Sequence, residues 1–372
     1  MLLPRLKPTV DVRRLPDGRL LVLRGDLVGH DFELEGDTAW IVELLGLLDG
    51  GQTVQQVSDA LGRRGLRNDP AVVAEALREL DEAELVEDAA NDAVLPEDYR
   101  ERFSRQLAFF SDLALPGRTG VAAQQRLMAG HVCVLGIGGL GSWAALALAC
   151  AGVGRMTIVD GDRLELSNLN RQILFRQSDI GRPKATAATD HLRRFSTVTR
   201  FYDVSRTLTS PRDIEEVVEG ADIVIAAADS PPHQIDRWTD QACFASGVPY
   251  LTISQQPPKV RIGPLYVPGR TGCFACLEMT YRQSHPDYDD VVESSPLISP
   301  AATFGPACGL VGSIAANEVV AYLAGLWSPA TLGRSWIIDL RTFAISPGEQ
   351  VPQSSCEACR GAISDLAGTA AS

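Results

Sequence analysis

The sequence lacks the features that mark several classes of protein. It has only five histidines, at positions 30, 131, 191, 233 and 285, and they form no metal-binding spacing. The longest apolar stretch, near Leu140–Gly152, is too short and too interrupted by glycine to span a bilayer. Arg5 and Lys7 lead into strand-like sequence rather than the apolar core of a signal peptide. We therefore expect a cytoplasmic protein with no membrane partner.

Positive charge is also scarce. The formal net charge is −13, and residues 1–100 hold 11 Lys/Arg against 21 Asp/Glu, so most of the excess negative charge lies in the first quarter of the chain. Nucleic acid is a polyanion and is bound by basic surfaces. The charge distribution therefore disfavours a nucleic-acid partner for this region.

The chain does contain a glycine motif between a strand and a helix. The motif reads G-x-G-x-x-G and consists of Gly136, Gly138 and Gly141. A predicted strand, Val132–Leu135, precedes it, and an Ala/Leu-rich helix follows to about Gly152. The next predicted strand, Met156–Val159, ends on Asp160. Such glycines let the backbone approach a phosphate group at a helix N-terminus, and the acid accepts a hydrogen bond from a ribose hydroxyl. The segment therefore predicts a nucleotide site.

The eight cysteines fall into two classes. Four stand alone, mostly in apolar sequence, and are expected to be buried thiols: Cys133, Cys150, Cys243 and Cys308. The others form two C-x-x-C pairs, Cys273 with Cys276 and Cys356 with Cys359. In a cytosolic chain two such pairs predict a tetrahedral zinc site, with a redox dithiol as the alternative. Four thiolates leave no position for a water ligand, so the zinc would be structural.

Residues 1–90 indicate a small α+β domain of winged-helix type. Alternating residues on either side of Pro16-Asp17-Gly18 predict a hairpin of Val10–Leu15 and Arg19–Arg24. Three helices are predicted next, over residues 37–48, 53–64 and 69–85, where Thr53 and Asp69 are cap residues. A purely structural domain is the alternative. Residues 91–101 are expected to form a polar linker.

Residues 102–360 alternate strand and helix, which is typical of a doubly wound α/β domain of Rossmann-like type. Further strands are expected at 221–226 and 249–253 and near 261–267, and a helix at 311–326. Residues 280–300 show no clear period and are expected to form a long loop. Residues 361–372 are expected to form a disordered tail.

A second group of polar residues is expected at the carboxyl ends of the strands, where a doubly wound sheet binds ligands. It consists of Asn168, Arg171, Gln172, Lys184 and Asp229. Arg171 and Lys184 would neutralise a triphosphate, and Asp229 would hold Mg²⁺ between phosphate oxygens. The set suits attack on phosphorus by a carboxylate, which is already ionised at neutral pH. Taken singly, each has a simpler interpretation as a surface charge or a strand-end cap.

The ordered motifs G-x-G-G-x-G, V-D-x-D, S-N-L-x-R-Q, P-K, A-D and two C-x-x-C pairs resemble the ThiF/MoeB/ubiquitin-activating superfamily over about residues 102–360. The resemblance implies an ATP-using adenylyltransferase with Mg²⁺ and structural Zn²⁺. It places the nucleotide on Gly136, Gly138, Gly139, Gly141, Asp160, Asp162 and Asn168. It implies catalytic roles for Arg105, Arg171, Gln172, Lys184 and Asp229. Arg105 would be an arginine finger lent to a neighbouring active site, which implies a homodimer.

Within this superfamily, residues 228–231, 264–276 and 300–306 resemble peptide-adenylating enzymes of the microcin C type. The first 90 residues resemble PqqD-like leader-peptide recognition domains, which bind an extended peptide at the edge of their hairpin. Together these resemblances imply ATP-dependent adenylation of a carboxylate on a ribosomally made precursor peptide in natural-product biosynthesis, with release of pyrophosphate.

Other functions stay open on the sequence alone. One is activation of the C-terminus of a sulfur-carrier protein, although simple activators of this kind lack an N-terminal domain. A following thioester transfer would need a nucleophilic cysteine, and Cys308 is the only candidate in the active-site half of the chain. Another is presentation of a leader peptide to a separate cyclodehydratase. An NAD(P)-dependent oxidoreductase is a more distant alternative.

Overall fold

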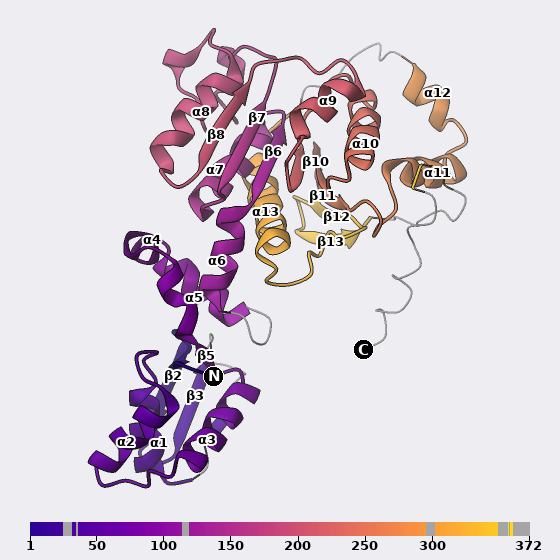
Figure 1. Cartoon of the computed structure of the whole chain (residues 1–372). Coiled ribbons are helices and arrows are strands. Elements are labelled where there is room, and N and C mark those ends of the chain that lie inside the picture. The colour runs from indigo at the N-terminus through magenta and orange to yellow at the C-terminus, as the bar shows by residue number, and fades with distance from the viewer. Residues whose placement is uncertain are drawn as a thin grey trace. The chain divides into compact units, whose positions relative to one another are not determined.

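The computed structural model describes residues 1–24, 32–34, 36–113, 119–294, 302–348, 356 and 358–359. The chain forms two compact units (Figure 1). The first consists of Met1–Arg126 with Ala324–Trp327, and the second of Leu127–Leu323 with Ser328–Ser372. The predicted tail at 361–372 lies outside the described residues.

The first unit contains two small antiparallel sheets. β2 (Val10–Arg14) and β3 (Leu20–Arg24) form the predicted hairpin, and β4 (Phe32–Leu34) pairs with the other edge of β3. A separate two-stranded sheet joins β1 (Pro4–Leu6) to β5 (Val86–Asp88), which the sequence did not indicate because both strands have three residues. The three predicted helices are confirmed as α1 (Thr38–Leu47), α2 (Val54–Arg63) and α3 (Pro70–Glu82).

Side-chain caps explain where these helices begin. The Asp37 carboxylate accepts hydrogen bonds from the backbone N–H groups of the first turn of α1. Thr53 and Gln56 form a reciprocal capping box at α2, and Asp69 caps α3, whose first residue is a proline. Each such cap stabilises its helix by about 1 kcal/mol. The apolar faces of the helices and of β3 then share one core, which includes Val22, Leu44, Leu61, Val73 and Leu77.

The residues of the predicted linker, 91–101, are largely helical. It contains most of a 3-10 helix, η1 (Ala89–Val94), and most of α4 (Glu97–Arg102). Acidic residues in the first turn of α4 and arginines in its last turn suit the helix dipole, a local signal that the apolar pattern does not carry. Two further helices follow, α5 (Ser104–Leu113) and α6 (Gly120–Ala129).

An eight-stranded sheet forms the second unit, in the order β13-β12-β11-β10-β9-β6-β7-β8. Its parallel strands are β6 (His131–Leu135), β7 (Arg155–Val159), β8 (Arg200–Val204), β9 (Ile223–Ala226) and β10 (Tyr250–Gln256). Its antiparallel strands are β11 (Lys259–Tyr266), β12 (Trp336–Asp339) and β13 (Ala344–Pro347). The doubly wound α/β fold is confirmed, whereas β8, β12 and β13 were not predicted.

Helices lie on both faces of this sheet (Figure 1). They are α7 (Gly139–Ala151), α8 (Lys184–Phe195), α9 (Pro211–Val218), α10 (Gln234–Ser246), α11 (Phe274–Ser284), α12 (Tyr288–Glu293) and α13 (Gly305–Ala324). Two 3-10 turns, η2 (Leu166–Asn168) and η3 (Gln177–Asp179), lie between β7 and α8. Helices α9, α10 and α11 share a core with β6, β9, β10 and β11 that contains Cys133, Val224, Ile235, Cys243 and Tyr250.

The prediction of a long loop at 280–300 is wrong over about half of that range. Residues 280–284 belong to α11 and residues 288–293 form α12, while residues 295–300 lie outside the described residues. The apolar residues Phe274 and Leu277, which anchor α11, precede the segment that was judged aperiodic. The last helix spans Gly305–Ala324, so it begins six residues before the predicted start at 311.

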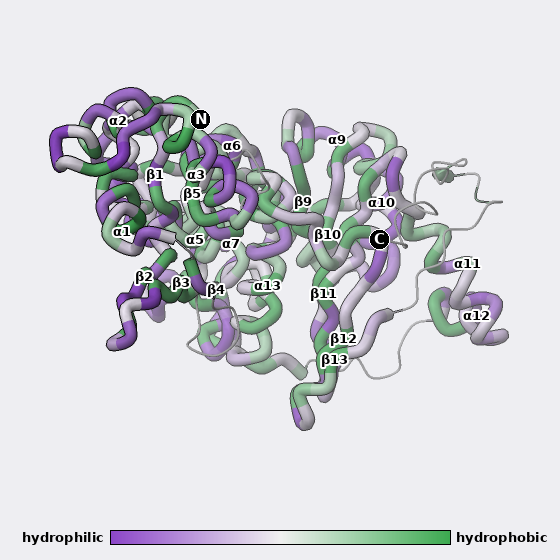
Figure 2. Tube along the Cα trace, turned by 90° about the horizontal axis from the view of Figure 1, so that it is seen from below, coloured by the Kyte–Doolittle hydropathy of each residue, from purple (hydrophilic) through white to green (hydrophobic). Residues whose placement is uncertain are grey.

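Helix α13 is the one described helix long and apolar enough to cross a membrane, and 61% of its most apolar window is buried inside the structure. Figure 2 shows hydrophobic residues along most of its length. Its Glu318 carboxylate is buried and accepts hydrogen bonds from the N–H and hydroxyl groups of Thr331, both at 2.7 Å. This is the pattern of a core helix.

The strand order determines where a ligand can bind. β6 lies between β7 and β9, so the chain leaves β6 toward one side of the sheet and later returns to the other. In open α/β sheets the crevice at such a switch point, outside the carboxyl ends of the strands, is the usual ligand site. The glycine motif follows β6, and Ala227–Asp229 follow β9, so both border this crevice.

Candidate active site

A cleft of about 1130 Å³ opens where the switch point predicts it. It is lined by ten of the twelve residues predicted for nucleotide binding and catalysis: Gly136, Gly138, Gly139, Asp160, Asp162, Asn168, Arg171, Gln172, Lys184 and Asp229. The other two are Gly141, in the first turn of α7, and Arg105. The fold therefore brings together residues that are separated by more than ninety positions in the sequence.

The glycine loop packs against the loop that follows β9. Gly136 has a φ of +88°, and a Cβ on it would lie 2.7 Å from the backbone nitrogen of Ala228. A Cβ on Gly141 would lie 2.0 Å from the Gly136 carbonyl oxygen, so the first turn of α7 closes directly over the loop. Gly138, the N-cap of α7, has no side-chain cap and faces the cleft. Helix N–H groups without such a cap form a site for a phosphate group.

Asp160 joins the end of β7 to this loop. Its carboxylate oxygens accept hydrogen bonds from the N–H groups of Ile137 and Asp162, both at 2.9 Å. Burial raises the pKa of Asp160, opposed by these N–H donors and by the charge of Lys184. The carboxylate is thus held in one orientation at the rim of the cleft, where a ribose hydroxyl could donate to it.

Lys184 is the first residue of α8 and is 7% exposed. Its Nζ donates to Asp162 Oδ2 at 2.7 Å, and the Asp162 side chain is 73% exposed. Among the described residues, the ammonium group forms an ion pair with this exposed carboxylate. A phosphate oxygen can replace that carboxylate as its partner. This geometry fits the phosphate role that was predicted for Lys184.

The turn around η2 positions the remaining polar residues. Asn168 Oδ1 accepts from the Glu165 N–H at 3.0 Å, so this buried side chain shapes the turn. Arg171 donates to the Ser167 carbonyl oxygen at 2.8 Å and lines the cleft. Gln172 is 3% exposed, and its buried Oε1 has no hydrogen-bond partner among the described residues. A buried acceptor left unpaired costs about 1–3 kcal/mol, which points to a ligand donor at this position.

Asp229 follows β9 and is exposed on the cleft. Its carboxylate forms no ion pair with any residue in the described part of the chain. Carboxylate oxygens are the ligands that Mg²⁺ takes from proteins in phosphate sites, so Asp229 fits the predicted metal role. Arg105, by contrast, lies on α5 in the other unit and is exposed. Its role in a neighbouring active site stays a prediction.

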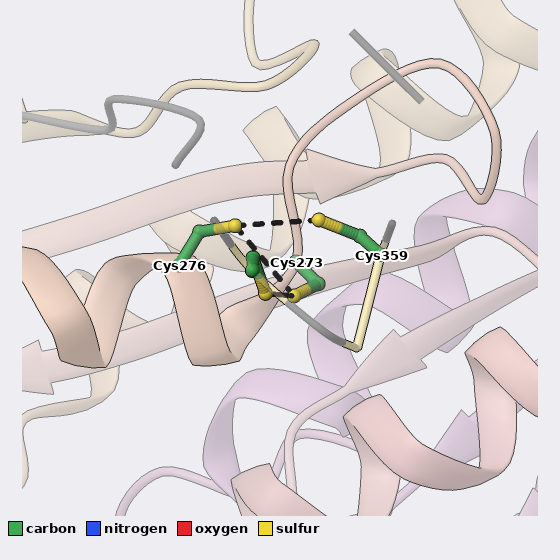
Figure 3. Close-up of side chains that lie close together, drawn as sticks. Cys273, Cys276 and Cys359 are labelled. Atoms are coloured by element: carbon green, nitrogen blue, oxygen red, sulfur yellow. Dashed lines mark hydrogen bonds between the residues drawn. The ribbon is translucent and has the colours of Figure 1, made fainter. Parts of the chain in front are cut away.

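The four paired cysteines form one cluster (Figure 3). Their sulfur atoms all lie within 4.8 Å of one another, with Sγ–Sγ distances of 3.8 Å for Cys273–Cys276, 3.6 Å for Cys273–Cys356 and 3.4 Å for Cys276–Cys359. Four sulfurs around zinc at about 2.3 Å are about 3.8 Å apart, so the cluster matches a tetrahedral site. It is too open for disulfides, whose sulfurs are about 2.05 Å apart. The site joins the end of the chain to the start of α11.

The single cysteines differ from one another. Cys133, Cys243 and Cys308 are buried as expected, and burial raises the pKa of Cys133 to about 12. Cys150 is exposed, which corrects the prediction, because the last turn of α7 presents it outward. Cys308 lines the cleft and donates to Gln255 Oε1 at 3.2 Å. Burial raises its pKa too, so its environment is that of a neutral thiol.

The cleft also contains functional candidates that sequence reasoning missed. Beyond the nucleotide residues it is lined by side chains from α10, β11, α11 and α12, including Asp236, Trp238, Arg261, Tyr281 and Tyr288. They form no motif because they come from four separate elements of the chain. Only the packing of these elements brings them to one wall.

Comparisons with known proteins match the part of the chain that forms this site. A family model described as the ThiF family matches residues 103–358. The sulfur carrier protein ThiS adenylyltransferase of Escherichia coli is 31% identical over 264 residues, which are 71% of this chain and 96% of that protein. The molybdopterin-synthase adenylyltransferase of the same organism is 28% identical over 236 residues, which are 63% of this chain and 89% of that protein.

Among solved structures, that of E. coli MccB with AMPCPP and MccA matches with a TM-score of 0.75 and 22% identity, over 96% of this chain and 99% of that chain. This likeness shows a shared fold. The family match covers more than half of the chain. It includes the glycine loop, the cleft and three of the four paired cysteines, and it ends just before Cys359. The chain therefore belongs to the ThiF family and is an adenylyltransferase of that type.

Proposed function

We propose that this adenylyltransferase acts on a ribosomally made precursor peptide, joining AMP from ATP to a carboxylate of the peptide in natural-product biosynthesis. The observation that carries the proposal is the extent of the fold match. The ThiS adenylyltransferase match spans 71% of this chain, whereas the MccB match spans 96% of it and 99% of MccB. MccB is described as a microcin C7 biosynthetic enzyme and was crystallised with N-formylated MccA.

The chemistry needs few groups from the protein. A carboxylate oxygen of the acceptor attacks the α-phosphorus of ATP, the bond to the bridging oxygen breaks, and pyrophosphate leaves with the electron pair. No base is needed, because the carboxylate is ionised at neutral pH. The N–H groups at the start of α7 would hold a phosphate, Asp160 the ribose, and Arg171 and Lys184 the charge that develops on the phosphate oxygens. Asp229 would hold Mg²⁺, which neutralises that charge when bound.

The first unit would hold the peptide. We assign it a PqqD-like role, in which the peptide adds as an extended strand to an edge of the β2-β3-β4 sheet. β2 and β4 are the edge strands of this sheet. The excess of acidic residues in this region suits a peptide more than a nucleic acid. We also propose that the protein is cytoplasmic and forms a homodimer, in which Arg105 of one subunit reaches the active site of the other.

Mass spectrometry tests the proposal directly. The purified protein is incubated with Mg²⁺, each NTP in turn, and short peptides encoded beside its gene, while pyrophosphate is assayed. A peptide heavier by one nucleoside monophosphate, or a dehydrated peptide with free AMP, is the expected result. Tight peptide binding without pyrophosphate release would instead identify a protein that presents the peptide to another enzyme.

A second candidate substrate is the C-terminus of a sulfur-carrier protein. It is favoured by the two relatives, which are named adenylyltransferases of ThiS and of molybdopterin synthase. A small carrier ending in Gly-Gly distinguishes the two substrates in the same pyrophosphate assay. Faster release with the carrier than with any peptide would replace the peptide proposal.

A further inference from the structure

Helix α13 packs closely against α7 and against the turn around η2. Its glycines at positions 305, 309 and 312 are four and three residues apart, so they share one face of the helix. A Cβ on Gly312 would lie 2.6 Å from the Trp143 Cβ and 2.8 Å from the backbone of α7. A Cβ on Gly305 would lie 2.7 Å from the Asn170 carbonyl oxygen. A side chain at either position would therefore push α13 away from the nucleotide site.

The side chain of Trp143, on α7, lies between α13 and this turn. Gly309 leaves space for the indole, because a Cβ there would be 3.5 Å from the ring, an ordinary van der Waals contact. The indole Nε1–H donates to the Arg171 carbonyl oxygen at 3.2 Å. An indole is a large apolar group with one N–H donor, so it can pack against a helix and still hold a polar atom. Trp143 therefore joins both helices to the backbone of Arg171.

Arg171 is held at several further points. Its guanidinium donates to the Ser167 carbonyl oxygen at 2.8 Å and to Asn170 Oδ1 at 3.0 Å, and both partners belong to the same turn. Its aliphatic stem lies against the glycine loop, since a Cβ on Gly139 would be 3.4 Å from the Arg171 Cγ. Among the described residues, the bond from Trp143 is the one hydrogen bond that connects Arg171 to an element outside its own turn.

This connection links the two parts of the site that would bind phosphate. Trp143 follows Gly139, the first residue of α7, by four residues, which is about one helical turn. Because a helical turn is rigid, the indole bond sets where the Arg171 backbone lies relative to the glycine loop. A cation stabilises the charge that develops on a phosphate most strongly when it is already in place before the reaction.

We infer that Trp143 is a positioning residue for Arg171. Its indole N–H fixes the Arg171 carbonyl oxygen, and α13 holds the indole against the turn, so that the Arg171 side chain stays beside the glycine loop. The inference rests on the phosphate role that the proposed function gives to Arg171. A tryptophan that only filled the core would have the same effect whatever residue stood at position 171, and this difference can be measured.

Calorimetry of ATP binding with Mg²⁺ to the full-length protein tests the inference and needs no acceptor. Trp143→Phe keeps an aromatic ring but removes the donor, and it should weaken ATP binding about three- to ten-fold, the contribution of one hydrogen bond. Arg171→Ala should weaken ATP binding at least as much, because it removes the cation itself. The double variant should bind ATP no more weakly than Arg171→Ala alone, because Trp143 acts through Arg171.

The matched control is Trp336→Phe. The Trp336 indole also donates to a backbone carbonyl oxygen, that of Ala330 at 2.8 Å, but Trp336 does not line the cleft. This variant loses the same kind of hydrogen bond and should bind ATP like the wild type. Thermal melts should show that all variants fold.

Two results would overturn the inference. One is equal ATP affinity of Trp143→Phe and Trp336→Phe, and the other is a double variant in which the free-energy losses of Trp143→Phe and Arg171→Ala simply add. Unchanged ATP binding by Arg171→Ala would overturn the phosphate role of Arg171 and, with it, the inference. Peptide adenylation is refuted by a different result, the absence of pyrophosphate with every peptide.

Discussion

Replacing Gly136 by alanine tests whether the loops after β6 and β9 touch as closely as the structure shows. Gly136 has a φ of +88°, and a Cβ there would lie 2.7 Å from the Ala228 nitrogen and 2.8 Å from its Cα. Both neighbours are backbone atoms, so they cannot move aside without shifting β9. The substitution should therefore disturb both the glycine loop and the position of Asp229.

A second glycine separates the free-energy cost of the left-handed backbone from that of the close contact. Gly181 has nearly the same φ, +87°, but a Cβ there would meet nothing within 4 Å. Gly181→Ala should therefore cost only the left-handed conformation, about 1–2 kcal/mol. Gly136→Ala should be destabilised by the same amount and by a further contribution of about 1–3 kcal/mol, because its Cβ overpacks against the loop after β9. The difference between the variants measures the contact between the loops.

The assay is thermal or urea unfolding of both variants, followed by nucleotide binding. A difference of 1 kcal/mol shifts the melting temperature by about 2–4 °C for a domain of 150–250 residues. Gly136→Ala should thus melt several degrees below Gly181→Ala and bind ATP more weakly. Equal melting temperatures for the two variants, with unchanged ATP binding by Gly136→Ala, would refute the close approach of the loops.

Four further predictions follow from the site. Elemental analysis should find one zinc per chain in the wild type and in Cys150→Ser at the exposed thiol, but none in Cys356→Ser; zinc in all three proteins would exclude the four-sulfur site. Asp229→Ala should abolish pyrophosphate release but leave peptide binding unchanged. Unchanged turnover in this variant would contradict the Mg²⁺-binding role proposed for Asp229. Gln172→Leu should leave the free energy of unfolding unchanged or raise it by up to about 1–3 kcal/mol, because it removes an unpaired buried amide oxygen, yet it should weaken ATP binding in calorimetry. Tight ATP binding would argue against a ligand contact. Because burial raises the pKa of Cys308, its thiol stays protonated near neutral pH. Iodoacetamide should therefore label the exposed Cys150 first, and labelling of Cys308 should increase only as the pH rises. Rapid labelling of Cys308 at pH 7 would favour a thioester role.

Much of the site could be predicted because its chemistry is written into short, local patterns. The spacing of Gly136, Gly138 and Gly141 between a strand and a helix requires no knowledge of distant contacts. The same holds for the two C-x-x-C pairs, whose residues share a turn. Caps such as Thr53 and Asp69 likewise act within three residues of their own position. The loop, the cysteine cluster and the caps are all present in the structure, because the interactions that form them are largely local.

Other parts could not be predicted, since nothing local encodes them. The end of α11 and all of α12 were taken for a loop, because the residues that anchor α11 against the core, Phe274 and Leu277, precede residue 280. β12 and β13 are four-residue strands that exist because β11 offers an edge for pairing. Cys150 was placed inside on the apolar character of its neighbours, whereas the rotation of α7 turns it outward.

By itself the sequence determined which chemical groups are present: a glycine loop before a helix, acids at two strand ends, two cations and two pairs of cysteines. It also determined the fold class, because alternating strands and helices can bury their apolar faces in few ways. Tertiary structure alone decided that Gly136 meets Ala228, that Lys184 pairs with Asp162, and that Gln172 keeps a buried oxygen without a partner among the described residues. It also brought residues of α10, β11, α11 and α12 to the same cleft as the glycine loop. The reason is physical: a motif is held by neighbours along the chain, whereas a pocket is held by packing between residues that only the folded sheet brings together.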